Sequence, residues 1–534
     1  MKIFAVINII NNAIAKPISF FCKSVFIPQA FKICIIILFS FLSFSSLAQQ
    51  RKQIELIQAE SMKFDRALGD NVRRLLNNVI FRHEETKMFC DSAYLFPNEN
   101  RLHAFSKIRI IVNDSVNIYG DKLFYNGNTR IAELHGNVRM VDNKMTLTTD
   151  HLFYNLETDV ANYYSGGKIV DSDNTLTSVF GYYYSDSKDS FFKKNVVLVN
   201  IEYTMYSDTL KYNTNTEIAY FFGPTRIVSD ENLIFCKDGW YDTKNDLSRF
   251  SKDAYLTNGE QYMSGDSLYY DRKKGYGKAV RNVFLMDSVQ NVIVTGEFAE
   301  HFEKEGVSEV TINPLMIVID KTDSLFLHAD TLKYVVVENE NKEKVKTMFA
   351  YHKSKFYRPD LQGLSDSIVY SFSDSIIYMY HDPILWSDKH QLTAKHIQIK
   401  TTNNSVKSLH LFDAAFIVTE DDLAKKFFNQ VKGRKIDGYV RNNELFKIDV
   451  FGNGETIYYV REENGALTGI NKTLSNTMTI YIEDKRIVRV TWREKPDSSL
   501  FPESKIKEDE MFLQNFKLHS DRRPESKEDI FIWK

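Results

Sequence analysis

The sequence predicts an all-β protein built as a long stack of repeats of about 29 residues. The motif Asp-x-Leu-x-Tyr occurs at Asp121–Tyr125 and again at Asp150–Tyr154, and a short apolar segment ending in Asp lies between them. The composition agrees with this fold class, because 29 Tyr and 39 Phe against only 10 Pro suit a pleated surface.

The Asp-x-Leu-x-Tyr motif returns at nearly constant intervals. Asp121 and Asp150 are 29 residues apart, and Asp150 and Asp208 are 58 apart, which is twice that interval. Fixed self-similarity at about 20 to 50 residues indicates a repeat architecture, and therefore one elongated body. Further copies begin at Asp266, Asp330 and Asp366, with weaker ones at Asp91 and Asp238 and one near Val179–Tyr184 that lacks the Asp.

The second motif, the short apolar segment that ends in Asp or Asn, keeps the same interval. Successive ends differ by 28 to 30 residues, so each repeat has two strand crossings and two turns. Turn-forming residues such as Asn126-Gly127-Asn128 mark the reversals. The ends fall at Asp114, Asp142, Asp171, Asn200, Asp230, Asn258 and Asp287.

Strand alternation places the Asp, Leu and Tyr of each motif on one face of the strand, and neighbours such as Lys122 and Phe124 on the other. The first face keeps its residue types from copy to copy, so we expect its Leu and Tyr to point inward. This predicted inward column consists of Leu123, Tyr125, Leu152, Tyr154, Leu210, Tyr212, Leu268, Tyr270, Leu332 and Tyr334.

The column fits two kinds of interior. One is a solid core, as in a closed β-solenoid. The other is an open trough for alkyl chains, in which each buried CH₂ would contribute ~0.8 kcal/mol. A tyrosine in every repeat favours the lip of a trough, because its ring is apolar while its hydroxyl needs a hydrogen-bond partner or water. The column residues are therefore the candidate lipid-binding residues.

The recurring Asp invites a catalytic or metal-binding interpretation, since paired carboxylates act as acid and base and stacked ones bind Ca²⁺. A catalytic pair is needed once, whereas this Asp recurs in each repeat. We therefore expect it at a turn or at the start of a strand, accepting hydrogen bonds from local backbone N–H groups. The 12 His are scattered, with His381, His390 and His396 closest to a cluster, and no sequence motif predicts a catalytic, metal or cofactor site.

The charge balance disfavours a nucleic-acid partner. Lys plus Arg is 68 and Asp plus Glu is 70, a net charge of −2, so the chain has no basic field to attract phosphates. Cys90 and Cys236 lie five repeats apart, too far for a disulfide, and are expected to be free, mostly buried thiols.

An export signal is predicted at the amino end, where Lys32 is followed by the apolar run 33–47 and the small residues Ser46 and Ala48. This run is shorter than the about 20 residues that span a membrane. We expect a loosely held or partner-dependent tail and an exposed loop or long hairpin at 338–344. The predicted organisation is a signal peptide at 1–48, the repeats at 49–420, a C-terminal β extension at 421–492 and a polar tail at 493–534.

The repeat resembles the OstA/LptA family of lipopolysaccharide-transport proteins. The resemblance is clearest at Asp121–Tyr125, Gly136–Met140 and Asp150–Asn155, and its periodic pattern covers residues 61–420. It implies an elongated, antiparallel OstA-type β-jellyroll, or β-taco, whose strands bend across two sheets and whose interior carries acyl chains. The residues after Glu420 are too few for the large outer-membrane barrel of the LptD relatives, because about ten residues are needed for each strand.

The resemblance implies a non-enzymatic periplasmic bridge that passes lipopolysaccharide or a related glycolipid toward the outer membrane. The implied partners are an inner-membrane export complex and an outer-membrane LptD-like translocon, both reached by edge-strand docking, with self-association as a further possibility. The alternative is a secreted β-helical polysaccharide-active enzyme or adhesin, which would carry an exterior cleft with two carboxylates about 5 to 10 Å apart. A passive spacer would have a sealed interior.

Overall fold

The computed structural model describes residues 52–534 apart from 65–66, 68, 70, 113–115, 143–144, 321–322, 403–404, 422, 425, 442–443, 463 and 484–485. The predicted signal peptide at 1–48 lies outside the described residues. Residues Ile54–Lys534 form one unit. No helix in the described part of the chain is long and apolar enough to cross a membrane.

Antiparallel strands make up most of the regular structure, and 36 of them are found in the described residues. The first eighteen are β1 (Glu55–Gln58), β2 (Ser61–Phe64), β3 (Arg73–His83), β4 (Thr86–Phe96), β5 (Arg101–Val112), β6 (Val116–Asn126), β7 (Ile131–Val141), β8 (Thr146–Asn155), β9 (Val160–Tyr163), β10 (Gly167–Val170), β11 (Asn174–Ser178), β12 (Phe180–Tyr184), β13 (Asp189–Asn200), β14 (Thr204–Asn213), β15 (Ile218–Val228), β16 (Leu233–Asp242), β17 (Leu247–Thr257) and β18 (Gln261–Asp271).

The other strands extend almost to the end of the chain, and short 3₁₀ helices follow them. The strands are β19 (Tyr276–Asp287), β20 (Val292–Phe302), β21 (Val307–Thr311), β22 (Leu315–Val318), β23 (Leu325–His328), β24 (Thr331–Glu338), β25 (Lys344–Arg358), β26 (Leu361–Ser371), β27 (Ile376–Tyr380), β28 (Ile384–Ser387), β29 (His390–Thr393), β30 (His396–Thr402), β31 (Ser405–Glu420), β32 (Phe428–Arg441), β33 (Glu444–Arg461), β34 (Leu467–Glu483), β35 (Arg486–Arg493) and β36 (Asp497–Phe501). The helices are η2 (Glu503–Lys505), η3 (Glu508–Met511), η4 (Ser520–Arg522) and η5 (Asp529–Phe531).

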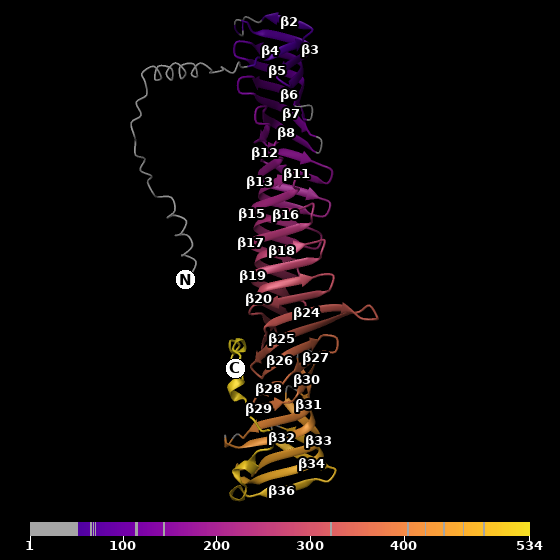
Figure 1. Ribbon diagram of the computed structural model, residues 1–534, viewed down its shortest axis with the longest axis vertical. Helices are drawn as coiled ribbons and strands as arrows, with labels where there is room; N and C mark the ends of the chain where they lie inside the picture. Colours follow the sequence, from indigo (N-terminus) through magenta and orange to yellow (C-terminus); the bar gives the residue numbers. More distant parts are fainter. Residues whose placement is uncertain are drawn as a thin grey trace, which may run out of the picture. The chain divides into compact units, whose positions relative to one another are not determined.

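Consecutive strands pair with each other, so they stack in chain order along the long axis of the unit (Figure 1). Where a strand is interrupted near its middle, its two halves keep the same neighbour. Thus β9 pairs with one end of β8 and β10 with the other. One predicted repeat of 29 residues corresponds to two such strands.

Every second strand bends near its middle, in most cases at two consecutive residues with left-handed backbone. Asn77 and Asn78 have φ of 59° and 48°, and Gly136 and Asn137 have φ of 73° and 47°. The pairing register shifts at the same places, which is the signature of a β-bulge. We call these places the corner, because each strand is folded there into two arms. Further corner pairs are Ser106-Lys107, Lys194-Asn195, Lys252-Asp253 and Arg281-Asn282.

The Asp of the repeated motif lies at this corner, so the prediction that it lies at a turn or strand start is wrong. Asp121 accepts a hydrogen bond from Asn137 Nδ2 at 2.7 Å, and Asp266 accepts one from Asn282 Nδ2 at 3.0 Å. Asp121 is exposed although Leu123 is buried, because the bulge changes the alternation of faces. At other corners a lysine contacts the Asp and forms an ion pair with it. These ion pairs are Lys107–Asp91, Lys252–Asp238 and Lys353–Asp330.

Substituting a corner glycine is expected to separate backbone strain from crowding. A Cβ at Gly136, where φ is +73°, would lie 2.7 Å from Asp121 Oδ2. Gly136→Ala is therefore expected to destabilise the protein by about 1–2 kcal/mol through its left-handed backbone, with a further loss from displacing Asp121. In the matched control Gly166→Ala, φ is +91° but no atom lies within 4 Å of the added Cβ. Urea denaturation measures both variants, and equal losses would contradict the corner contact.

The turns follow the chemistry that the sequence predicts. Asn126 Oδ1 accepts a hydrogen bond from the backbone N–H of Asn128 at 3.0 Å, and Asp287 Oδ1 accepts one from Val289 at 3.0 Å. Asx turns therefore form at two kinds of position. One is the residue after the motif tyrosine, and the other is the residue that ends the apolar segment. The polar stretch at 338–344 closes the long β24–β25 hairpin (Figure 1).

The polar tail packs against the stack, so the prediction of a loosely held end is wrong. Gln430 is 0% exposed, donates from Nε2 to the Met511 carbonyl at 2.9 Å and accepts from the Leu513 N–H at 2.8 Å. Gln391 likewise donates one hydrogen bond to the tail backbone and accepts another from it. Further along the tail, Lys355 Nζ donates to a backbone carbonyl at residue 532.

The tail covers an apolar outer face of the C-terminal strands. On β31 the residues alternate between two cores, because Ala415 and Ile417 belong to the interior while Phe416 and Val418 belong to a separate cluster. Strand alternation requires those two clusters to lie on opposite faces. The outer cluster contains Phe416, Val418, Phe427, Ile457, Tyr459, Ile470, Ile506 and Leu513, so the tail adds a third layer there.

Cys90 and Cys236 are free and buried, as the sequence predicts. Burial raises the pKa of each thiol to about 12. Because the thiolate is the reactive form, neither cysteine is expected to react with iodoacetamide at pH 8 until the protein unfolds. The unfolded chain loses these protons near the ordinary pKa of 9.0, so the stability contributed by the thiols falls as the pH rises above that value. Mass spectrometry counts the adducts, and labelling of either thiol in the folded protein would contradict this burial.

Candidate functional site

All ten residues of the predicted inward column face the interior between the two arms. The leucines are buried, with exposed fractions of 1% at Leu123 and 0% at Leu152. Tyr125 and Tyr154 are each 1% exposed, whereas Tyr212, Tyr270 and Tyr334 are half-buried. The structure distributes the column along the stack, one Leu and one Tyr on each motif strand, and forms a strip instead of a single pocket.

The tyrosines alternate with small residues on the intervening strands. Tyr125 pairs with Ala132, which pairs in turn with Tyr154 on the next strand. A small partner on every second strand leaves room for each ring to lie across it. The cross-strand series is Tyr125, Ala132, Tyr154, Ala161, Tyr183, Ser190, Tyr212, Ala219, Tyr241, Ser248, Tyr270 and Gly277.

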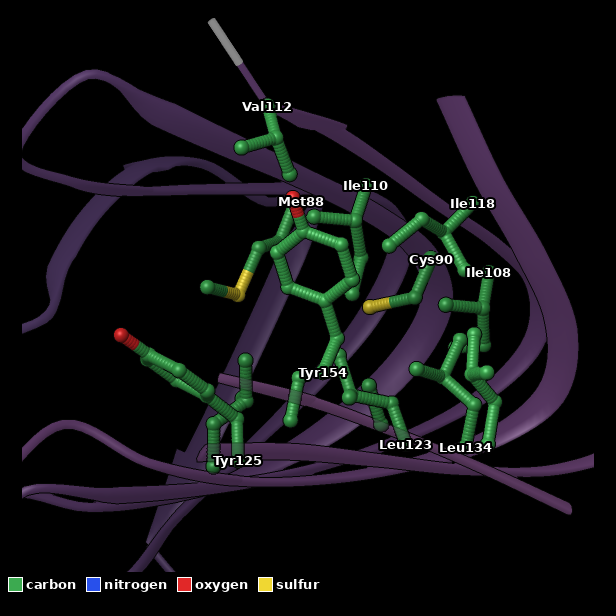
Figure 2. Close-up of a cluster of buried hydrophobic side chains, with 14 of the residues drawn as sticks. Met88, Cys90, Ile108, Ile110, Val112, Ile118, Leu123, Tyr125, Leu134 and Tyr154 are labelled. Atoms are coloured by element: carbon green, nitrogen blue, oxygen red, sulfur yellow. The ribbon is translucent and has the colours of Figure 1, made fainter. Parts of the chain in front are cut away.

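The opposite wall of the interior is aliphatic, and we call it the aliphatic ladder. Figure 2 shows Met88, Ile110 and Ile118 on one side of the interior, facing Tyr125 and Tyr154 on the other. Each member pairs directly with the next. The series is Met88, Ile110, Ile118, Met140, Leu147, Ile169, Leu176, Leu198, Met205, Ile227, Ile234, Leu256, Met263, Leu285, Val294, Met316 and Leu327.

The two ends of the strands meet at a seam opposite the corner. A straight strand of the eleven residues in β6 would hold its ends about 33 Å apart. Instead, the Tyr125 hydroxyl at the end of β6 lies 2.6 Å from Nδ1 of His83, the last residue of β3, on the other side of the interior. The corner bend is what brings these opposite ends together.

Polar contacts cross the seam at several levels of the stack. The Tyr183 hydroxyl donates to Asp142 Oδ2 at 3.0 Å, and Arg130 Nη2 lies 2.9 Å from Glu84 Oε1. A longer-range ion pair, at 3.0 Å, joins Arg272 with Glu202, 70 residues earlier in the chain. These contacts lie between turns of the two arms, so the apolar interior has a polar rim.

Tyrosine hydroxyls contribute to this rim. Tyr154 donates to Asp159 Oδ1 at 3.3 Å, and Tyr270 donates to Glu303 Oε2 at 2.7 Å. Burial, together with the hydrogen bond to Glu303, raises the pKa of Tyr270 to about 12, so its hydroxyl stays protonated at neutral pH. Burial is also the main cause that raises the pKa of Tyr125 and Tyr154.

The interior is tightly closed at one end and partly accessible further along. From Ile54 to Tyr183 the core is a continuous cluster of buried side chains, which matches the solid-core interpretation. From Leu198 onward several members of the aliphatic ladder are only partly buried, which matches the trough interpretation. These partly buried members are Leu198, Ile227, Ile234, Leu256, Met263, Leu285 and Val294.

Two surface pockets accompany the stack. One, of about 490 Å³, is lined by the turn Asn200–Thr204 and by Tyr206, Arg226 and Val228. The other, of about 410 Å³, is lined by His396, Phe412, Asp413, Arg434, Lys435 and Phe451. Neither pocket is lined by a residue of the predicted inward column.

Sequence reasoning missed a cluster on the outer face. Glu133 and His135 of β7 and His151 of β8 place three potential ligand atoms within 4.8 Å of one another. The signal was present in the repeat, because aligning the two strands as a hairpin places His135 directly opposite His151. His390 and His396, which the sequence places closest to a cluster, instead lie on separate short strands, β29 and β30.

The fold and its interior define a class of protein: an antiparallel stack of bent strands with an apolar interior and a polar seam. A family model described as OstA-like protein matches residues 51–208 and 202–266. Over these residues the chain is similar to OstA-like proteins, which confirms the resemblance stated for the repeat.

The chain is also similar to a solved structure, LptH of Pseudomonas aeruginosa, described as the LptA-homologous periplasmic component of the conserved lipopolysaccharide transport device. The sequence identity is 12%, the TM-score is 0.21, and the match covers 27% of this chain and 95% of that chain. A search of curated proteins finds no match.

Proposed function

We propose that this protein is a non-enzymatic carrier in the periplasm, which holds the acyl chains of lipopolysaccharide or a related glycolipid between its two arms and passes them toward the outer membrane. The proposed contacts are the aliphatic ladder on one wall and the Leu/Tyr column on the other. The observation that carries the proposal is the continuity of these apolar walls from one strand to the next.

The accessible part of the interior supports a lipid occupant. Partly buried Ile, Leu, Met and Val side chains that point inward from Leu198 onward leave apolar surface in contact with water. Covering that surface with an alkyl chain contributes roughly 25 cal/mol for each Å² removed from water. The polar rim of tyrosine hydroxyls and seam ion pairs would contact the head group. An amphipathic ligand needs both an apolar interior for its acyl chains and polar groups for its head group.

Docking to other components is proposed through the terminal strands of the stack. Near one end, β2 exposes Met62 at 50% and Phe64 at 65%, and at the other, β36 exposes Leu500 at 54%. An exposed strand edge pairs readily with a strand of another protein. The partners would be an inner-membrane export complex and an outer-membrane translocon, or a second copy of this chain.

Photo-crosslinking from a matched pair of tyrosines tests the proposed lipid site. Tyr212 faces the interior, whereas Tyr220 on the adjacent strand alternates with buried Ala219 and Phe221 and therefore faces outward. With p-benzoylphenylalanine at each position, irradiation in the presence of lipopolysaccharide is expected to give an adduct at Tyr212 and little or none at Tyr220. Equal adducts at both positions, or none at Tyr212, would contradict the proposal.

A further inference from the structure

We propose that Glu133, His135 and His151 form a binding site for a first-row divalent cation, with Zn²⁺ as the best-suited ion. His135 Nε2 lies 3.0 Å from Glu133 Oε1, and His151 Nε2 lies 2.9 Å from the same oxygen. Two imidazoles and one carboxylate that leave an open position are a recognised Zn²⁺ ligand set. This site goes beyond the proposed lipid carriage and does not depend on it.

The local fold explains why the three side chains converge. Glu133 and His135 are two residues apart on β7, so they share a face, and His135 is paired directly with His151 on β8. Buried Leu134 and Leu152 hold the opposite face in the core, which fixes the cluster on the outside of the sheet. The exposed side-chain fractions of 36%, 35% and 28% for His135, Glu133 and His151 leave the cluster open to an ion from solvent.

Aromatic neighbours hold the imidazoles in place. The two imidazole rings stack on each other, with centroids 4.1 Å apart and planes at 21°. Phe124 packs edge-on against His135 at 5.5 Å, and Phe153 packs against His151 at 4.5 Å. A site whose ligands are already oriented loses less conformational entropy when the ion binds.

The geometry needs only a small adjustment to hold an ion. Ligand atoms about 2.0–2.2 Å from a tetrahedral Zn²⁺ are separated from one another by about 3.3–3.6 Å. The two observed N···O separations of 3.0 and 2.9 Å are shorter than this, and all three ligand atoms lie within 4.8 Å of one another, so rotation of the Glu133 side chain can bring the set to the required spacing. Lys122, the cross-strand neighbour of His135 on β6, is exposed, so its ammonium group can turn to solvent.

Glutamine variants separate an ion site from a simple hydrogen-bonded cluster. A glutamine amide at either histidine position can still donate an N–H to Glu133, so the double variant His135→Gln/His151→Gln keeps the hydrogen bonds while losing both imidazole ligands. His103→Gln is the matched control, because His103 lies in the same outer row of rings, against Phe96 and Phe124, and no carboxylate among the described residues forms a hydrogen bond with it.

Calorimetric titration of the purified protein with ZnCl₂ is the test. We expect one Zn²⁺ to bind the parent protein and the His103→Gln control equally, and binding to weaken by about 100-fold or more in the double variant. X-ray absorption of the loaded protein should show scattering from two imidazoles. Circular dichroism checks that each variant is folded. Affinity within about threefold of the parent protein in the folded double variant, or a spectrum without imidazole scattering, would overturn the site.

Discussion

Replacing Phe221 with alanine is expected to destabilise the middle of the stack by about 3–5 kcal/mol. Phe221 is 0% exposed and stacks on Phe250, with ring centroids 6.4 Å apart and planes at 6°. Gly239 lies between them on the intervening strand, so no other side chain can fill the space that the ring leaves. Urea denaturation, with hydrogen exchange of β15–β17 as a local probe, measures the loss.

The adjacent residue provides the control for that prediction. Phe222 is 44% exposed and points to the outer face of the same strand. Phe222→Ala is therefore expected to change stability by no more than about 0.5 kcal/mol. A larger loss at Phe222 than at Phe221 would mean that the inward and outward faces have been assigned the wrong way round.

Gln430→Ala is expected to release the C-terminal tail. The substitution removes the hydrogen-bond partner of the Met511 carbonyl, at a part-buried position, and that of the Leu513 N–H, at a buried position. Each unpaired backbone group costs about 1–3 kcal/mol, so a local loss of roughly 2–6 kcal/mol is expected for the two groups. Limited proteolysis is the measurement, with faster cleavage within residues 502–534 as the expected result.

The control for the tail prediction is a glutamine that contacts no tail residue. Gln290 is exposed in the turn between β19 and β20, so Gln290→Ala should leave the cleavage rate unchanged. Unchanged cleavage in Gln430→Ala as well would show that the tail is held by other contacts, such as that of Arg523 with Gln362.

The repeat and its inward face could be predicted from the sequence, because both depend on local alternation. Leu123 and Tyr125 recur two residues apart in copy after copy, and that pattern has one physical solution in a strand. The family resemblance followed from the same residues. The Asx turns at Asn126 and Asp287 were predictable for a similar reason, since they involve only the next few residues of the chain.

The corner was missed because strict alternation contains no information about a bulge. Asp121 belongs to the same set of alternate residues as Leu123, and only the shift in register opposite Gly136 and Asn137 turns it outward. The small partners of the tyrosines, such as Ala132, were missed because they lie on the intervening strand, where no motif drew attention to them.

The packing of the tail depends on tertiary contacts, whereas the Glu133–His135–His151 cluster depends only on the pairing of the adjacent strands β7 and β8. Gln430 looks like an ordinary polar strand residue, and its role is set by a backbone segment 81 and 83 residues later in the chain. The composition of the tail is polar and did not indicate that a few apolar side chains, Ile506 and Leu513 among them, pack the tail against the strands.

Native mass spectrometry of the protein purified without detergent tests the central claim most directly. If the two apolar walls enclose acyl chains, the parent protein should carry a bound glycolipid or phospholipid. Met263→Arg, which introduces a charge on the aliphatic ladder where it is partly accessible, should carry much less. A lipid-free parent protein, or equal lipid on the parent and the Met263→Arg variant, would contradict the account.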